Sequence, residues 1–308
     1  MVTGHNAWRL VLLLWVCYLS AQVVLALLFL PMRGKFLVER VERVALLNAL
    51  VVMVVLLAPT FLYVWERGWC WREAFRWRGV RWQIALATLV GTLALGAAIS
   101  QGLLWLMQLF PEIPVVSQSK LTELLSGATR AVSPLLLLLA VMLPALPEEL
   151  VFRGVLQQAF ERCYRPAKAI IVTSLVFAAF HLDLLQMLSV FPIALFWGWV
   201  AWRSQSVLPS LLAHALQNGV TVVSVLSTSA SGVSGGMSLP TFSPQWGVAV
   251  SGLLLWGGTV LILKRCFDGR GDGNGKATCE FHAHQTGAPD RGDGERGFGV
   301  DERGRFAG

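Results

Sequence analysis

The segment PLLLLLAVMLPALPEELVFRGVLQ, residues 134–157, decides the fold class of this chain. It is as apolar as a membrane span, yet it carries two adjacent glutamates, Glu148 and Glu149, with Arg153 one helical turn further on. A carboxylate near the centre of a bilayer costs about 2.5–3.5 kcal/mol on insertion scales unless it is paired or hydrated. We therefore expect the two glutamates to serve a function.

The whole chain has the composition of a membrane protein. Of its 308 residues, 55% are hydrophobic and only 14% are charged, and the mean hydropathy of +0.62 is far above that of soluble domains. Apolar runs of about 20 residues, enough to cross a hydrocarbon core of about 30 Å, recur along it. We expect an all-α, polytopic transmembrane bundle with about eight spans, over residues 8–30, 44–64, 82–110, 134–160, 169–187, 188–202, 208–226 and 246–263.

A change of composition divides the chain into two parts. Residues 1–264 form the predicted transmembrane domain, whereas residues 265–308 are rich in Gly, Asp and Arg. Such a segment cannot bury enough apolar surface to offset the entropy of ordering it. We expect residues 265–308 to be a disordered cytoplasmic tail.

The charged loops predict how the helices are oriented. The net charge of +7 comes from the membrane domain, so it indicates membrane orientation and not nucleic-acid binding. Arginine and lysine fill the loops around residues 67–81 and 162–168, but are absent from the fifth and seventh loops. By the positive-inside rule both termini face the cytoplasm, as in a multi-pass protein of a bacterial inner membrane. The basic first loop, residues 31–43, departs from this assignment unless it forms an interfacial helix.

Further polar residues fall in neighbouring apolar segments. His181 and His214 are the two histidines away from the termini, and Asn218 follows His214 by one helical turn. Because a membrane helix hides its polar face from lipid, we expect these residues, both glutamates and Arg153 to converge on one interior cavity. The alternative is purely structural, with a salt bridge inside one helix and hydrogen bonds between helices.

These residue types are suited to hydrolysis. A carboxylate and an imidazole can hold and deprotonate a water molecule, while a second imidazole and an amide stabilise a developing oxyanion. A peptide bond is the expected target.

Three motifs carry a resemblance to a known family. EELVFR at residues 148–153, FAAFH at residues 177–181 and HALQN at residues 214–218 resemble the motifs E-E-x-x-x-R, F-x-x-x-H and H-x-x-x-N/B. These are motifs of the CPBP intramembrane proteases, also called the ABI or CAAX-protease and bacteriocin-processing family, which includes the type II CAAX prenyl endopeptidases. The resemblance covers about residues 134–226. It implies an endopeptidase whose substrate is a membrane protein or a lipidated, CAAX-like peptide.

The resemblance also implies a role for each site residue. Glu148 resembles the general base, and His181 resembles the second group that holds the water. The remaining implied roles are oxyanion stabilisation by His214 and Asn218, and orientation by Glu149 and Arg153.

The family resemblance leaves the use of a metal open, because its members are often called metalloproteases. In one interpretation Zn²⁺ is held by Glu148, His181 and His214 with one open position. In the other, glutamate and histidine activate the water without a metal. Asparagine is a poor zinc ligand and the chain has no H-E-x-x-H motif, so we expect the glutamate-dependent mechanism and no firmly bound cofactor.

Two other classes of protein could carry the same polar residues. In a proton- or cation-coupled transporter the carboxylates and histidines would form an ion relay. The chain shows no inverted repeat, although Pro144 and Pro147 would loosen the helix just before the glutamates. A non-catalytic immunity or binding protein that keeps the cavity without turnover is the second alternative.

Overall fold

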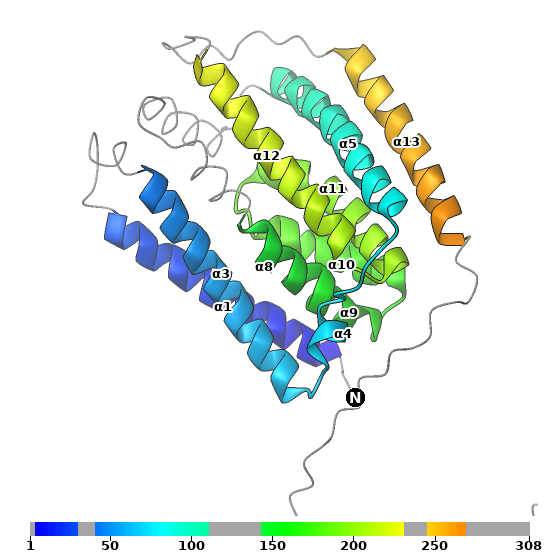
Figure 1. Ribbon diagram of the computed structural model, residues 1–308. Coiled ribbons are helices and arrows are strands. Elements are labelled where there is room, and N and C mark those ends of the chain that lie inside the picture. Colours follow the sequence, from blue (N-terminus) through cyan, green and yellow to red (C-terminus); the bar gives the residue numbers. More distant parts are fainter. Residues whose placement is uncertain (1–3, 30–40, 111–142, 231–244, 269–308) are drawn as a thin grey trace, which may run out of the picture. The chain divides into compact units, whose positions relative to one another are not determined.

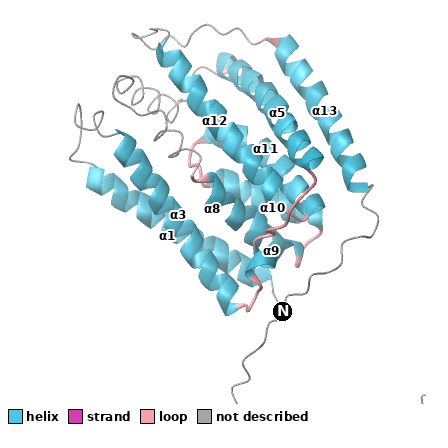
Figure 2. Cartoon of the chain, viewed as in Figure 1, coloured by secondary structure: helices cyan, strands magenta, loops and turns pink. Residues whose placement is uncertain are grey.

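The computed structural model of the protein describes residues 4–29, 41–110, 143–230 and 245–268. These residues fold into helices, and no strand occurs among them (Figure 2). They all belong to one compact unit, which spans residues 1–275. The all-α class predicted from the sequence is confirmed. Most of the predicted tail, and much of the first, third and seventh loops, lie outside the described residues.

Five helices are long and apolar enough to cross a membrane. At 1.5 Å per residue even the shortest of them, with 21 residues, is roughly 32 Å long, which matches a hydrocarbon core of about 30 Å. Large apolar side chains point outward from them, with Leu12 66% and Leu254 72% exposed, as lipid contact requires. The chain is an integral membrane protein. The five helices are α1 (Gly4–Phe29), α3 (Val41–Glu66), α5 (Trp82–Leu109), α11 (Leu184–Ser204) and α13 (Trp246–Asp268).

The predicted number of eight spans is not confirmed. One predicted span corresponds to α10 (Pro166–Ala179), whose 14 residues reach only about 21 Å. Another corresponds to α12 (Leu208–Ala230), which has the expected length but is not among the five apolar helices. A third, residues 134–160, begins in a part of the chain that lies outside the described residues.

The boundary between the two spans predicted at residues 169–187 and 188–202 is wrong. Helix α10 ends at Ala179 and α11 already begins at Leu184. Between them Leu182 adopts a positive φ of 55°, and the Asp183 side chain accepts a hydrogen bond from the backbone N–H of Gln186 at 2.8 Å. An aspartate at this position caps the start of a helix. The chain therefore turns immediately after His181.

The segment that carries the glutamates is not a regular α-helix. A short helix α8 (Ala145–Glu149) is followed by a π-helix, η1 (Leu150–Leu156), and then by α9 (Gln157–Glu161). In a π-helix each backbone N–H bonds to the carbonyl five residues earlier, which widens the turn, and such turns are frequent at functional sites. Here the wide turn begins directly after Glu149.

The helices pack along one another with close contacts at small residues. Helix α13 lies along α5, α1 lies beside α3, and α10 packs against α11 (Figure 1). Both α11 and α12 also contact α5. At Gly252 the approach of α13 to α5 is so close that an added Cβ atom would lie 2.7 Å from the Ala94 carbonyl oxygen. Small residues permit such approaches between membrane helices.

Hydrogen bonds join the helix ends into one basic end of the protein. The start of α12 meets the segment before α5, where the Val207 N–H donates to the Arg76 carbonyl at 3.1 Å. The start of α5 meets the end of α13, where Arg81 donates to the Cys266 carbonyl. The start of α1 meets the segment after α9 through Trp8, whose indole N–H lies 3.5 Å from the Tyr164 hydroxyl.

Cations outnumber acids at this basic end. Among the described residues, the acids at this end are Glu66, Glu73, Glu161 and Asp268, and the bases are Arg9, Arg67, Arg72, Arg76, Arg78, Arg81, Arg162, Arg165, Lys168, Arg203, Lys264 and Arg265. The first and last described residues, Gly4 and Asp268, belong to the same end.

Candidate functional site

The two adjacent glutamates occupy different environments. The Glu149 side chain is completely buried, whereas the Glu148 side chain keeps 19% of its surface exposed. Neighbouring residues on a helix point about 100° apart, so α8 can aim one carboxylate into the protein and leave the other accessible. The two carboxylates are therefore not equivalent.

Glu149 pairs with charged and polar groups from two helices. Its Oε1 atom lies 2.9 Å from Nη1 of Arg153 and 3.0 Å from Nδ1 of His214. Arg153 is 1% exposed, so this is a fully desolvated ion pair, which is stable only with good geometry and further hydrogen bonds. The expected alignment of Glu149 with Arg153 on one helix face is confirmed.

His214 lies between the two glutamates. While its Nδ1 atom faces Glu149, its Nε2 atom lies 3.6 Å from Oε2 of Glu148. The distance to Glu148 is longer than a hydrogen bond, but it places the imidazole edge next to the accessible carboxylate. His214 thus connects the buried ion pair to the exposed glutamate.

Two aromatic rings fix this arrangement. Trp197 of α11 stacks on His214 with ring centroids 4.7 Å apart, and its indole N–H donates to Thr92 of α5 at 3.0 Å. The guanidinium carbon of Arg153 lies 4.3 Å from the centroid of the Phe177 ring. Cation–π contacts of this kind are stronger when they are desolvated. Neither Phe177 nor Trp197 was predicted to have a role, and in the sequence only the F-x-x-x-H spacing points to Phe177.

His181 lies on the turn that follows α10. Its Nδ1 atom is 3.2 Å from the Phe177 carbonyl oxygen, and its ring packs edge-on against Phe177 with centroids 5.3 Å apart. The same Phe177 ring lies 5.8 Å from that of His214. The ring of Phe177 therefore contacts both histidines. Asn218 lies one helical turn beyond His214 on α12, as its spacing predicted.

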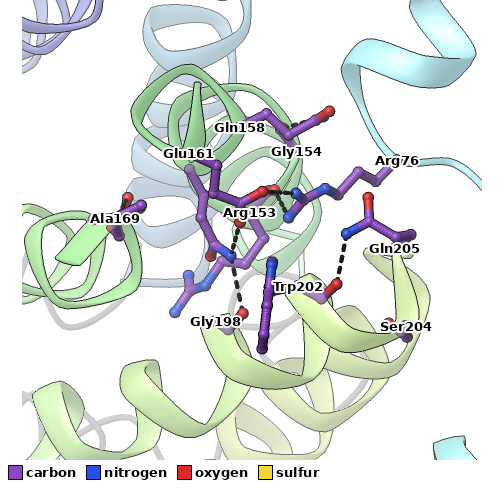
Figure 3. A network of polar contacts seen from close by, with 12 residues as sticks. Arg76, Arg153, Gly154, Gln158, Glu161, Ala169, Gly198, Trp202, Ser204 and Gln205 are labelled. Atoms are coloured by element: carbon purple, nitrogen blue, oxygen red, sulfur yellow. Dashed lines mark hydrogen bonds and ion pairs between the residues drawn. The ribbon is translucent and has the colours of Figure 1, made fainter. Parts of the chain in front are cut away.

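A second polar network links residues of the basic end to the Arg153 segment (Figure 3). Arg76 is 3% exposed; it forms an ion pair with Glu161 of α9 and also donates to the Arg153 carbonyl at 3.4 Å. Gln157 donates to Glu161 at 2.8 Å and to the Gly198 carbonyl at 2.9 Å. Burial lowers the pKa of the Arg76 guanidinium, and Glu161 opposes that shift. This network was not predicted, although Gln157 and Glu161 have the i, i+4 spacing of a helical pair.

The predicted zinc ligands are not grouped as a metal site in the described part of the chain. No group of three or more His, Cys, Asp or Glu side chains there is arranged to hold an ion. His181 directs Nδ1 to a backbone carbonyl, and His214 directs Nδ1 to Glu149. Both contacts leave Nε2 as the free ring nitrogen, so the zinc interpretation of Glu148, His181 and His214 stays a prediction.

The geometry defines a class of protein, an all-helical membrane protein with a buried carboxylate–imidazole site. Residues 130–220 match the family model described as type II CAAX prenyl endopeptidase Rce1-like. The matched segment contains every predicted site residue, from Glu148 to Asn218, so the resemblance predicted from the three motifs is confirmed over this segment. Here the chain is similar to a family of CAAX-type proteases. No curated protein and no solved structure matches the chain.

Proposed function

We propose that this chain is an intramembrane endopeptidase that uses Glu148 to activate a water molecule against a peptide bond. The observation that carries the proposal is the position of His214, whose two ring nitrogens face two glutamates of unequal exposure. The match of residues 130–220 to a protease family supports the same reaction class.

The unequal burial of the glutamates supports different roles for them. Glu149 is bound to Arg153 and His214 and has no exposed surface, so water and substrate do not reach it. Glu148 is partly exposed, so a water molecule can reach its carboxylate. Glu148 is therefore the proposed general base, and Glu149 orients His214.

His181 is suited to hold the attacking water. When Nδ1 carries the hydrogen and donates to the Phe177 carbonyl, Nε2 is left as an acceptor. A water that donates one hydrogen to Glu148 and the other to His181 keeps both oxygen lone pairs for attack. This arrangement is how a carboxylate and an imidazole share the activation of one nucleophile.

The proposed reaction then follows in two steps. The water oxygen bonds to the substrate carbonyl carbon while its proton passes to Glu148, which leaves a tetrahedral oxyanion. His214 and Asn218 stabilise this oxyanion; His214 donates to it from Nε2 as the imidazolium, because Nδ1 already donates to Glu149. The carbon–nitrogen bond breaks as Glu148 returns the proton to the leaving amine.

The depth of the site supports a membrane-associated substrate. Helix α10 begins at the basic end, and its 14 residues place His181 about 21 Å from that end. At this depth an apolar or lipid-anchored peptide is the substrate class that reaches the site at low cost. A membrane-associated protein, including one with a lipidated CAAX-like C-terminus, is the proposed substrate.

The basic end is the proposed cytoplasmic end of a bacterial inner-membrane protein. Its excess of cations supports this orientation, and Gly4 and Asp268 at the same end support cytoplasmic termini. Reporter fusions after Arg81 and after Ser229 are expected to land on opposite sides of the membrane.

The deciding experiment compares purified wild type with Glu148→Gln. Both are incubated in detergent with a library of lipidated and unlipidated membrane peptides, and products are identified by mass spectrometry. Wild type is expected to cleave a subset, and Glu148→Gln to lose at least about a hundredfold in rate. Glu73→Gln, which removes a carboxylate at the basic end, is the matched control. Cleavage by Glu148→Gln at the wild-type rate would reject Glu148 as the base.

Two further arms separate the alternatives. Chelator treatment is expected to leave cleavage intact, whereas loss on chelation with recovery on zinc addition would overturn the metal-independent mechanism. Proteoliposomes of the same preparation are expected to show no proton or cation flux. Flux that disappears in Glu148→Gln, without any cleavage by wild type, would replace the protease with a transporter.

A further inference from the structure

A cluster of two arginines and two aromatic residues at the basic end has the composition of an anion site. It consists of Tyr63, Arg67, Trp69 and Arg162, and we call it the rim cluster. The guanidinium carbon of Arg162 lies 3.9 Å from the centroid of the Trp69 ring, and that of Arg67 lies 5.3 Å from the Tyr63 ring. The two rings meet edge to face, with centroids 5.8 Å apart and planes at 89°.

A helix-ending turn builds the rim cluster. At the end of α3, Gly68 has a φ of +60°, a conformation that glycine adopts without steric cost. The Trp69 N–H donates to the Val64 carbonyl at 3.1 Å and the Gly68 N–H to the Trp65 carbonyl at 3.0 Å. These two bonds form a Schellman motif. The turn folds Trp69 back against Tyr63 and towards Arg162.

The cluster has polar groups without protein partners. Tyr63 is only 8% exposed. Its buried hydroxyl lacks a hydrogen-bond partner among the described residues. Buried tyrosine hydroxyls normally find a partner. The hydroxyl interacts electrostatically with both Arg67 and Arg162, so it lies close to the two cations.

The two arginines also lack an ion pair. Within the described ranges neither Arg67 nor Arg162 forms a salt bridge, and Glu73 is the acid that interacts electrostatically with Arg162. By contrast, Arg203 at the same end pairs with Asp268. Two unpaired guanidinium groups beside an unpaired hydroxyl match the acceptors of a phosphate.

We propose that the rim cluster binds the phosphate of an anionic phospholipid in the leaflet at the basic end. The two arginines pair with the phosphate oxygens, and their side chains move towards the phosphate, so that the Tyr63 hydroxyl, buried in the lipid-free protein, donates a hydrogen bond to one of these oxygens. Beside the cluster α3 exposes large apolar side chains, with Leu62 49% and Trp65 71% exposed, before the exposed Glu66 ends the helix. These apolar side chains accommodate the acyl chains, which favours a lipid over a free phosphate.

Native mass spectrometry of the full-length protein in detergent tests the lipid site. Phosphatidylglycerol, phosphatidylcholine and soluble glycerol phosphate are titrated separately. We expect wild type to retain phosphatidylglycerol, and the Arg67→Gln/Arg162→Gln double variant to bind it at least about tenfold more weakly. Arg203→Gln/Lys264→Gln, which removes the same charge from the same end, is expected to bind like wild type.

Each remaining outcome overturns the proposal in a defined way. Equally weakened phosphatidylglycerol binding in both double variants would show that net charge, and not the rim cluster, determines the binding. Equal retention of phosphatidylcholine would exclude recognition of anionic lipid, and equal binding of glycerol phosphate would make the cluster a site for soluble anions. Tyr63→Phe retains both arginine charges and the aromatic ring. It therefore tests the lipid site if the double arginine variant does not fold. Unchanged phosphatidylglycerol binding by Tyr63→Phe would then reject the site.

Discussion

One oxygen atom, Oε1 of Glu149, accepts from both Nη1 of Arg153 and Nδ1 of His214, at 2.9 and 3.0 Å. This carboxylate therefore joins the π-helical segment to α12 inside the protein. Its neighbour Glu148 has no comparable contact, because its nearest basic group, Nε2 of His214, is 3.6 Å away. The two glutamates should respond very differently to the same substitution.

Glu149→Gln is expected to destabilise the protein strongly. The substitution leaves the buried Arg153 without its counter-charge, and breaking a buried pair costs about 3–5 kcal/mol. Thermal unfolding of the detergent-solubilised protein measures the effect. Glu148→Gln is the matched control and should shift the unfolding temperature by no more than a few degrees. Similar losses in the two variants would contradict the assigned difference in environment.

Trp197→Phe is expected to lower the cleavage rate about tenfold, because the smaller ring holds His214 less firmly above Glu149. It also removes the hydrogen bond to Thr92. Thr92→Val removes that hydrogen bond but keeps the indole ring, so it separates the two effects. Cleavage rates of the two variants on one peptide are compared. If Thr92→Val were the more damaging, the hydrogen bond and not the stacking would position His214.

Gly252→Ala is expected to destabilise the protein by about 1–3 kcal/mol, because the added methyl group must displace the α5 backbone. The built Cβ atom lies only 2.7 Å from the Ala94 carbonyl oxygen. Gly257→Ala on the same helix meets nothing within 4 Å, so it should be neutral or stabilise α13 by up to about 1 kcal/mol. The thermal unfolding temperatures of the two variants are compared. Equal stability of the two variants would mean that α13 and α5 are not held at this distance.

Arg76 and Glu161 are expected to show a large coupling free energy. Arg76 is 3% exposed and its partner 14%, and charges in one buried network couple by about 0.5–3 kcal/mol. A double-mutant cycle of Arg76→Gln and Glu161→Gln, measured by unfolding, gives this energy. The exposed pair Arg203–Asp268 is the control, with an expected coupling below about 1 kcal/mol. If the coupling free energy of Arg76 and Glu161 were no larger than that of the control pair, their ion pair would not support the Arg153 segment.

Much of the candidate site follows from helical periodicity alone. Glu149 meets Arg153, and Asn218 follows His214, because residues four apart share one face of a helix. The burial rule for polar groups in lipid then brings His214 to the glutamates. Local spacing and lipid solvation are sufficient for these contacts.

Other features depend on contacts between distant residues or on backbone irregularity, which a single sequence does not display. The π-helical turn at Leu150 resembles an ordinary apolar helix in its pattern. In the sequence Trp197 is one apolar residue among many in a predicted span, and its stacking on His214 is visible only in the folded protein. In the sequence Arg76 is one of several loop arginines, and nothing there indicates that it is buried against Glu161. The turn at His181 was not predicted because a single capping residue, Asp183, marks it between two apolar segments.

The early end of α10 affects how water can enter the interior of the bundle. Phe180 packs against Trp15 and Tyr18, which lie near the middle of α1, so the chain unwinds halfway across the bilayer. Peptide groups released from a helix at that level require hydration or protein cover, since hydrocarbon offers them nothing. The break beside His181 therefore offers polar backbone groups to a water molecule inside the apolar bundle, and the proposed hydrolysis requires water at that depth.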